Sequence, residues 1–152
     1  MQTYEHRQLS PWLLLAFVLI LVAFAFFGNS GVGQLEKLAA FVLVSLLTLA
    51  FASLCTRVDA GGVSWTYTWG FPGGSIPFSD IAEVQMTRTS WWEGFGIHWS
   101  LWHGWLWNVW GHAAVSIRKR NGALITLGTD DPQGLYDAIA RLGPHSGAAM
   151  TS

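Results

Sequence analysis

The sequence predicts a membrane-anchored α+β protein, in which a two-helix transmembrane hairpin precedes an antiparallel β domain with a C-terminal capping helix. Two uncharged apolar runs, at 9–27 and 38–56, predict the membrane helices because each has nineteen residues and no polar stripe. Alternation of apolar and polar residues with a period of two predicts the strands that follow. An amphipathic pattern at 132–142 predicts the final helix.

The first apolar run follows a short polar leader, residues 1–8. At about 1.5 Å per residue, nineteen helical residues extend roughly 28 Å, close to the ~30 Å of a hydrocarbon core. Trp12 lies near the start of this run, where an aromatic side chain suits a membrane interface. The glycine-rich segment 28–33 separates the two runs and predicts the turn of the hairpin, so the whole hairpin occupies 9–56.

Charged residues indicate the topology of this hairpin. Arg7 precedes the first run and Arg57 follows the second, which favours cytoplasmic positions for both termini and for the C-terminal domain. A signal peptide is the alternative, because Ala23-Phe24-Ala25 has the small-x-small form of a cleavage site. Cleavage there would leave a single span.

The charge balance of the second part of the chain restricts its partners. Residues 1–56 contain four charged side chains, whereas 57–152 contain six basic and seven acidic ones, a net charge of −1. A nucleic-acid-binding domain usually carries a basic surplus on one face, so we expect no nucleic-acid partner. The single cysteine, Cys55, excludes an internal disulfide.

Seven of the ten tryptophans lie between Trp91 and His112. The alternation there predicts a β-hairpin that turns at His103-Gly104 and carries aromatic side chains on both faces. We expect one face, with the strand before it, to fill the core of the domain through Trp65, Trp69, Trp99, Trp105 and Trp107. The opposite face needs a cover, which we expect to be a membrane interface, a protein partner or an apolar ligand, and it consists of Trp92, Trp102 and Trp110.

A second hairpin near the C-terminus has to place two pairs of apolar residues on one face. A three-residue loop at 120–122 sets Ile117 opposite Ile125, whereas a two-residue loop would mix the faces. We therefore expect Gly122 in the left-handed conformation of a bulged turn. The tip is basic, and its residues are candidates for contact with anionic headgroups as well as for simple solvation: Arg118, Lys119 and Arg120.

The β domain is expected to span 62–142 and to end in a helix with clear end signals. Asp131 is a suitable N-cap, and Pro132 suits the first helical position. An apolar stripe at helical spacing predicts the buried face, formed by Leu135, Ala138, Ile139 and Leu142. The tail, 143–152, is expected to be disordered.

Several segments resemble bacterial pleckstrin-homology (PH)-like membrane proteins, a small uncharacterised family with N-terminal transmembrane helices. The resemblance rests on IPFSDIAEV at 76–84, GFGIHW at 94–99 and the stretch 104–142, whose GTDDP motif is its most specific part. It implies a PH-like antiparallel β-barrel or sandwich in a protein of the bacterial inner (cytoplasmic) membrane. It also implies a binding or assembly role without catalysis.

A metal or catalytic site is the alternative to a binding role. His98, His112 and Glu93 lie in the tryptophan-rich stretch, and such side chains serve as metal ligands and as acid–base groups. Their spacing does not predict convergence on one point, and no nucleophile motif accompanies them. We therefore expect no metal, no cofactor and no enzyme, but a module that contacts lipid headgroups, a second copy of itself or a membrane protein.

Overall fold

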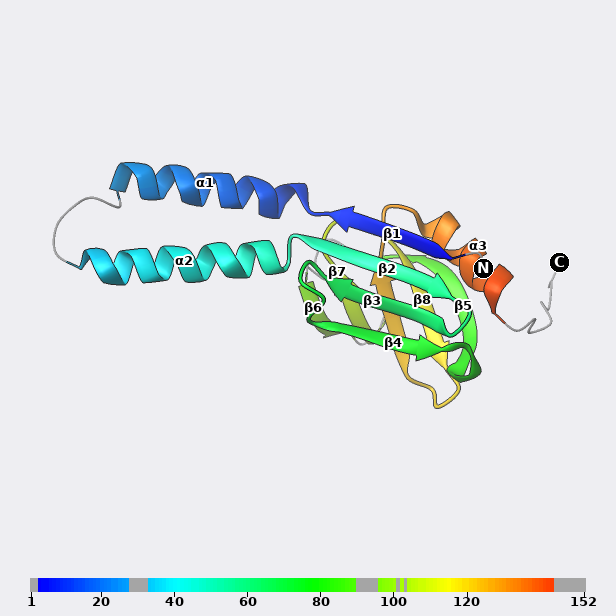
Figure 1. Cartoon of the computed structure of the whole chain (residues 1–152). Coiled ribbons are helices and arrows are strands. Elements are labelled where there is room, and N and C mark those ends of the chain that lie inside the picture. Colours follow the sequence, from blue (N-terminus) through cyan, green and yellow to red (C-terminus); the bar gives the residue numbers. More distant parts are fainter. Residues whose placement is uncertain (1–2, 28–32, 90–95, 101, 103, 144–152) are drawn as a thin grey trace.

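A long helical hairpin projects from one end of a β domain (Figure 1). The computed structural model describes residues 3–27, 33–89, 96–100, 102 and 104–143. The chain forms strand β1 (Tyr4–Leu9), helices α1 (Pro11–Phe27) and α2 (Gln34–Ala50), and then strand β2 (Ser53–Asp59). The later elements are β3 (Gly62–Tyr67), β4 (Gly73–Pro77), the 3-10 helix η1 (Phe78–Asp80), β5 (Ile81–Arg88), β6 (Gly96–Ser100), β7 (Gly104–Asn108), β8 (Ala113–Lys119), β9 (Leu124–Gly128) and α3 (Pro132–Leu142).

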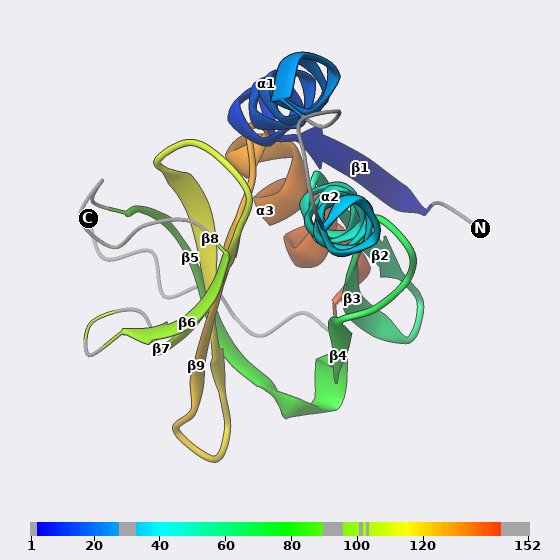
Figure 2. The same ribbon diagram turned by 90° about the vertical axis from the view of Figure 1, so that its left-hand side faces the viewer.

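Two sheets and α3 enclose the core of the domain. The first sheet has the order β1-β2-β3-β4, and the second has the order β5-β8-β9-β7-β6. Helix α3 packs between them and contributes buried residues to the same core (Figure 2). The most deeply buried side chains of this core come from both sheets and the helix, and they include Leu54, Tyr67, Ile76, Ile117, Leu127 and Leu135. The domain thus buries its apolar side chains without help from the hairpin.

The two helices are shorter than the apolar runs that predicted them. Helix α1 begins only at Pro11, and the second run continues past α2 into β2, where Leu54 and Thr56 are buried in the domain. No helix in the described residues is long and apolar enough to cross a membrane. The predictions of a transmembrane hairpin and of a multi-pass inner-membrane protein are therefore wrong. An apolar run alone does not separate a helix from a buried strand.

The residues predicted as a polar leader form β1, which is an edge strand of the first sheet. It pairs antiparallel with β2, from Tyr4 opposite Val58 to Leu9 opposite Ser53. A backbone hydrogen bond from Ser10 N to Ala52 O, at 2.8 Å, continues this pairing. The helical hairpin is therefore an insertion between two paired strands.

The predicted β-barrel is also wrong, because the described strands form two separate sheets that do not close. The chain leaves the first sheet after β4, turns through η1 and enters the second sheet at β5. The second sheet is not wholly antiparallel either. Strands β7 and β9 are parallel, with Trp105 opposite Ile125 and Trp107 opposite Leu127.

The C-terminal hairpin and the start of α3 confirm the sequence predictions. Ile117 lies opposite Ile125, and Gly122 has a φ of 86°. The Gly122 N–H donates to the carbonyl of Lys119 at 2.9 Å, which closes the turn. Asp131 caps α3 by accepting a hydrogen bond from the N–H of Gly134 at 2.9 Å, and Pro132 opens the helix.

Candidate functional site

The helical hairpin presents an apolar surface that the rest of the described chain leaves uncovered. Helix α1 contains no polar residue, and its apolar side chains point in all directions around its axis. The exposed large side chains include Leu14, Leu15, Val18, Leu19, Leu21 and Val22 on α1, and Leu35, Leu38, Val42, Leu43, Leu46 and Leu47 on α2. A helix that is apolar all round occurs inside a larger apolar environment, so this surface requires a cover.

The two helices lie side by side and contact each other through aromatic side chains (Figure 1). The rings of Phe24 and Phe41 stack with their centroids 4.2 Å apart. Among the polar residues of α2, Thr48 donates a hydrogen bond to the carbonyl of Val44 at 2.8 Å within the helix. Glu36 lies in the first turn of α2, at the end far from the domain. Between that end and the base, α2 is apolar apart from Ser45 and Thr48.

The base of the hairpin is fixed to the domain at both helices. The Ser10 side chain accepts a hydrogen bond from the N–H of Leu13 at 3.3 Å, in the first turn of α1. Phe51, directly after α2, packs edge-on against Tyr67 with 5.0 Å between ring centroids. These contacts hold the start of α1 and the end of α2 against the same end of the domain.

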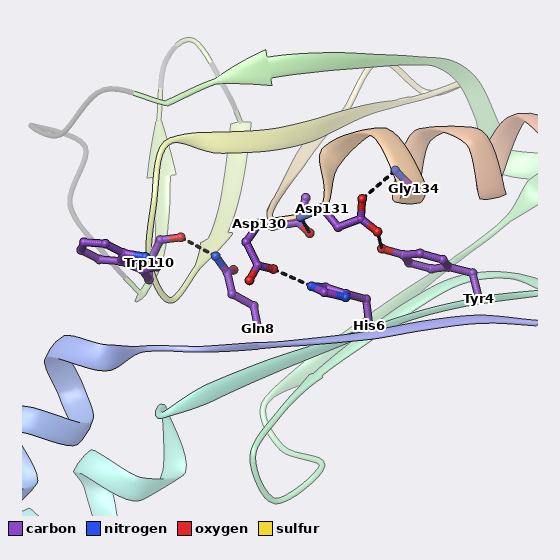
Figure 3. A network of polar contacts seen from close by, with 8 residues as sticks. Tyr4, His6, Gln8, Trp110, Asp130, Asp131 and Gly134 are labelled. Carbon is purple, nitrogen blue, oxygen red and sulfur yellow. Dashed lines mark hydrogen bonds and ion pairs between the residues drawn. The ribbon is translucent and has the colours of Figure 1, made fainter.

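The first inward-facing residue of β1 ties this strand to α3 (Figure 3). The Tyr4 hydroxyl donates to Asp131 Oδ2 at 3.1 Å, while Asp131 Oδ1 accepts from the N–H of Gly134. Burial, followed by the hydrogen bond to Asp131, raises the pKa of Tyr4 well above its ordinary value. One carboxylate therefore joins the N-terminal strand to the C-terminal helix.

The next two inward residues of β1 continue the same row toward the hairpin. His6 Nε2 contacts Asp130 Oδ1, and Gln8 Nε2 donates to the carbonyl of Trp110 at 2.7 Å. The row was missed by the sequence analysis because its side chains are polar. The period-two pattern of YEHRQL is the signal that could have revealed it.

The outer face of β1 carries a charged side chain that forms an ion pair with one on β2. Arg57 Nη2 lies 2.6 Å from Glu5 Oε2, and this contact holds the pKa of Glu5 below its usual range. Together with Arg7 and Cys55 these side chains line a shallow hollow of about 310 Å³. An exposed ion pair adds little stability. We regard the hollow as part of the solvated side of the sheet.

The tryptophans expected in the core have different surroundings. Trp65 is buried and packs edge-on against the half-buried Trp107, with 5.6 Å between ring centroids. Trp69, Trp99 and Trp105 are each more than half exposed, so the prediction that they fill the core is wrong. Trp69 lies beyond the end of β3. Trp99 and Trp105 face each other across β6 and β7, and no other described element covers this part of the β6–β7 hairpin.

The second set of tryptophans has one strongly exposed member. Trp102 is 81% exposed at the turn between β6 and β7. Trp110 is half-buried, and its ring lies 5.9 Å from that of Trp12 at the base of α1. Trp92 lies outside the described residues.

The basic turn between β8 and β9 makes contacts within the domain. Arg118 Nε lies 3.2 Å from a carboxylate oxygen of Glu83, and Lys119 Nζ lies 3.7 Å from one of Asp80. Arg120 Nε donates to a backbone carbonyl at 2.8 Å. The turn lies away from the helical hairpin (Figure 1), and contact of these residues with anionic headgroups stays a prediction.

The residues of the catalytic or metal alternative form no cluster in the structure. His98 lies on β6 opposite Leu106, with Nε2 buried and without a hydrogen-bond partner among the described residues. His112 is exposed before β8, and Glu93 falls outside the described residues. Within the described ranges, no three His, Cys, Asp or Glu side chains are placed to hold a metal ion.

Comparison with known proteins identifies no family for this chain. No protein-family model matches it, and no curated protein matches its sequence. The resemblance to PH-like bacterial membrane proteins is therefore not supported. Its most specific motif, GTDDP at 128–132, has a local explanation, because Asp131 caps α3 and its N–H donates to Thr129 Oγ1 at 3.0 Å.

Proposed function

We propose that the protein is a non-enzymatic lipid-binding module, in which the apolar surface of the helical hairpin contacts lipid while the β domain lies at the lipid surface. The observation that carries the proposal is the apolar surface that surrounds the hairpin. Helix α2 lies along one side of α1, and acyl chains can cover the apolar side chains that stay exposed around both helices. Lipid is therefore the cover that fits α1 best.

The way in which the hairpin joins the domain supports this role. Because β1 and β2 pair directly at its base, both helices leave the same end of the domain. The domain then lies at the lipid surface on one side, with α3 at the end away from the hairpin (Figure 1). The fully buried side chains of its core come from the two sheets, η1, α3 and the segment between β7 and β8, and Phe51, directly after α2, packs against this core from the base of the hairpin.

Flotation with vesicles tests the proposal. The full-length protein, delivered from detergent, is mixed with phosphatidylcholine vesicles that contain phosphatidylglycerol and is centrifuged in a sucrose gradient. We expect the protein to float with the vesicles and a Leu15→Asp/Leu19→Asp variant to stay at the bottom. Both leucines are exposed, and each aspartate in an apolar helix costs about 2.5–3.5 kcal/mol in lipid. The matched control is Ala82→Asp/Met86→Asp, at two exposed positions of the edge strand β5, and it should float like the wild type.

A second copy of the chain is the competing cover for the hairpin. In that case the protein would stay at the bottom of the gradient. It would also dimerise in a concentration-dependent manner without lipid, and Leu15→Asp/Leu19→Asp would abolish the dimer. This pair of results would refute lipid binding.

A further inference from the structure

The strongly exposed aromatic side chains of the domain are concentrated at the end from which the hairpin projects. Phe71 is 79% exposed and Trp102 is 81% exposed, which is unusual for side chains of this size. We define the aromatic collar as the exposed tryptophan and phenylalanine side chains of this end: Trp12, Trp69, Phe71, Trp99, Trp102 and Trp105. They come from three separate parts of the chain.

The turn between β3 and β4 is placed beside the hairpin by strand pairing. Leu54, at the start of β2, lies opposite Tyr67, and the Thr68 hydroxyl accepts a hydrogen bond from Ser53 N at 3.1 Å. Because β2 begins a few residues after α2 ends, the turn that carries Trp69 and Phe71 lies next to the base of α2. Figure 1 shows this turn on the hairpin side of the domain.

The second part of the collar lies on the edge of the other sheet. Strand β6 is the last strand in the order β5-β8-β9-β7-β6, and this edge lies on the side of the domain from which the hairpin projects (Figures 1 and 2). Trp99 and Trp105 face each other across β6 and β7, and Trp102 lies at the turn between them. Trp12 completes the set in the first turn of α1.

The chemistry of the collar matches the boundary between water and lipid. Indole has an apolar ring and a polar N–H, and tryptophan is enriched at the depth of lipid headgroups. The segments that carry the domain part of the collar, 67–78 and 96–108, contain no aspartate, glutamate, lysine or arginine. An uncharged aromatic surface around the base of an apolar hairpin is continuous with the surface that lipid covers in the proposed function.

We propose that the aromatic collar rests in the headgroup region of the lipid and fixes the orientation of the β domain. This inference rests on the proposed function, and it goes further because it assigns a lipid contact to the domain itself. The apolar side chains of the hairpin then contact the acyl chains, the edge strand β6 and the turn between β3 and β4 touch the lipid surface, and α3 points toward water. This contact includes four aromatic side chains that the sequence placed in the core or left without a role: Trp69, Phe71, Trp99 and Trp105.

Site-specific labels on the full-length protein test the collar. In a Cys55→Ser background, single cysteines carry a fluorophore whose emission reports polarity, and the labelled proteins are bound to phosphatidylcholine–phosphatidylglycerol vesicles. Phe71→Cys and Trp102→Cys probe two separate parts of the collar. Val18→Cys probes the exposed surface of α1, and Ala140→Cys probes the exposed face of α3 at the opposite end of the domain. All four positions are outside the core, so each variant should fold.

The expected pattern is a gradient of depth. The emission of the Val18 label should shift to the blue, and nitroxides in the acyl chains should quench it. Nitroxides on the headgroups should quench the labels at Phe71 and Trp102. The Ala140 label should stay open to iodide in the water. The Val18 label could be buried in lipid while iodide quenches the labels at Phe71 and Trp102 as strongly as the label at Ala140. In that case the proposed contact of the collar with headgroups is wrong and the proposed function stands. If no label responds to vesicles, both are wrong.

Discussion

Three of the hydrogen bonds of Asp131 connect it to different parts of the fold. One carboxylate oxygen accepts from Gly134 N in α3, the other accepts from the Tyr4 hydroxyl in β1, and its own N–H donates to Thr129 Oγ1. An N-cap usually serves only its own helix. Here the same side chain also joins the helix to the first strand, so its removal should affect both.

Replacement of this residue should be the most costly of the exposed or half-exposed polar substitutions. For Asp131→Ala we expect the free energy of unfolding to fall by about 2 kcal/mol, since a helix cap and a partly buried hydrogen bond are lost together. Urea titration of the full-length protein in mild detergent, followed by tryptophan fluorescence, measures the change. Asp137→Ala on the exposed side of α3, which breaks one contact with Gln133, is the control and should cost less than about 0.5 kcal/mol. Equal losses for the two variants would contradict the joint role of Asp131.

Two tyrosines should make the stability of the domain sensitive to high pH. Burial, followed by Asp131, raises the pKa of Tyr4 above its ordinary value of 10.0, and burial raises the pKa of Tyr67. A raised pKa means that the folded protein holds the phenolic proton more tightly than the unfolded chain. The stabilisation is therefore complete below about pH 10 and is lost as the pH rises from there toward the folded-state values.

Thermal unfolding between about pH 9 and pH 11 checks this dependence. The Tm of the wild-type protein should fall with rising pH, and the slope should be smaller in Tyr4→Phe/Tyr67→Phe. The variant also loses the Tyr67 hydrogen bond to the Asn108 carbonyl, so the slopes and not the absolute Tm values are compared. Parallel slopes would show that these two phenols do not account for the effect.

At the level of the elements, two glycines with positive φ differ in what a side chain would cost. At one a Cβ would both strain the backbone and collide with a neighbour, and at the other it would only strain the backbone. Gly104 starts β7 with a φ of 62°, and a Cβ there would lie 2.0 Å from the backbone oxygen of Leu124. Gly122 has a φ of 86° and open space around the same position. The first glycine therefore determines how closely β7 approaches β9, whereas the second only shapes a turn.

We expect Gly122→Ala to lower the free energy of unfolding by about 1–2 kcal/mol, which is the cost of a left-handed conformation for an L-residue. Gly104→Ala should cost clearly more, because the backbone of β9 has to move as well. Urea unfolding of the two variants under identical conditions measures both values. The assignment of the parallel β7–β9 pair would be in error if the two substitutions had the same effect.

The elements that sequence reasoning predicted well are those in which one face is apolar and the other polar. The register of β8 and β9 followed from this alternation, because Ile117 and Ile125 have to share the buried face. Strand β1 was missed for the opposite reason: its inward residues Tyr4, His6 and Gln8 are polar and are satisfied by groups from distant parts of the chain. No local pattern identifies such partners.

The candidate site was less predictable than the fold of the domain. Where both faces of a hairpin are aromatic, alternation cannot tell which face is covered, and so Trp99 and Trp105 were assigned to the core. The apolar run at 38–56 likewise extends across a helix end, since Leu54 is as apolar in β2 as the leucines of α2. Which apolar residues are buried depends on the tertiary arrangement.

On the scale of the whole molecule, the domain and the hairpin are separable parts. The bond from Ser10 N to Ala52 O at 2.8 Å makes these two residues an antiparallel pair at the base of the hairpin, where a two-residue loop could connect them. We predict that replacement of residues 11–51 by Asn-Gly gives a folded, monomeric β domain, since β1 and β2 keep their pairing and the connection becomes short. Cooperative urea unfolding and analytical ultracentrifugation check the fold and the mass.

The same shortened protein separates the two lipid contacts. Without the hairpin it should remain at the bottom of the flotation gradient, because the aromatic collar alone offers a limited apolar area. A shortened protein that floated like the full chain would place the main lipid contact in the domain. One that failed to fold would show that the hairpin is part of the folding unit.

The position of β1 ahead of the hairpin sets the order in which the molecule can be completed during synthesis. The ribosome releases β1 first and the apolar helices next, before any residue of the remaining domain exists. The partner of Tyr4 in α3 follows 127 residues later. The first strand is thus finally secured only after the start of α3 has been synthesised, and the apolar helices need shelter from water well before the domain beside them has formed.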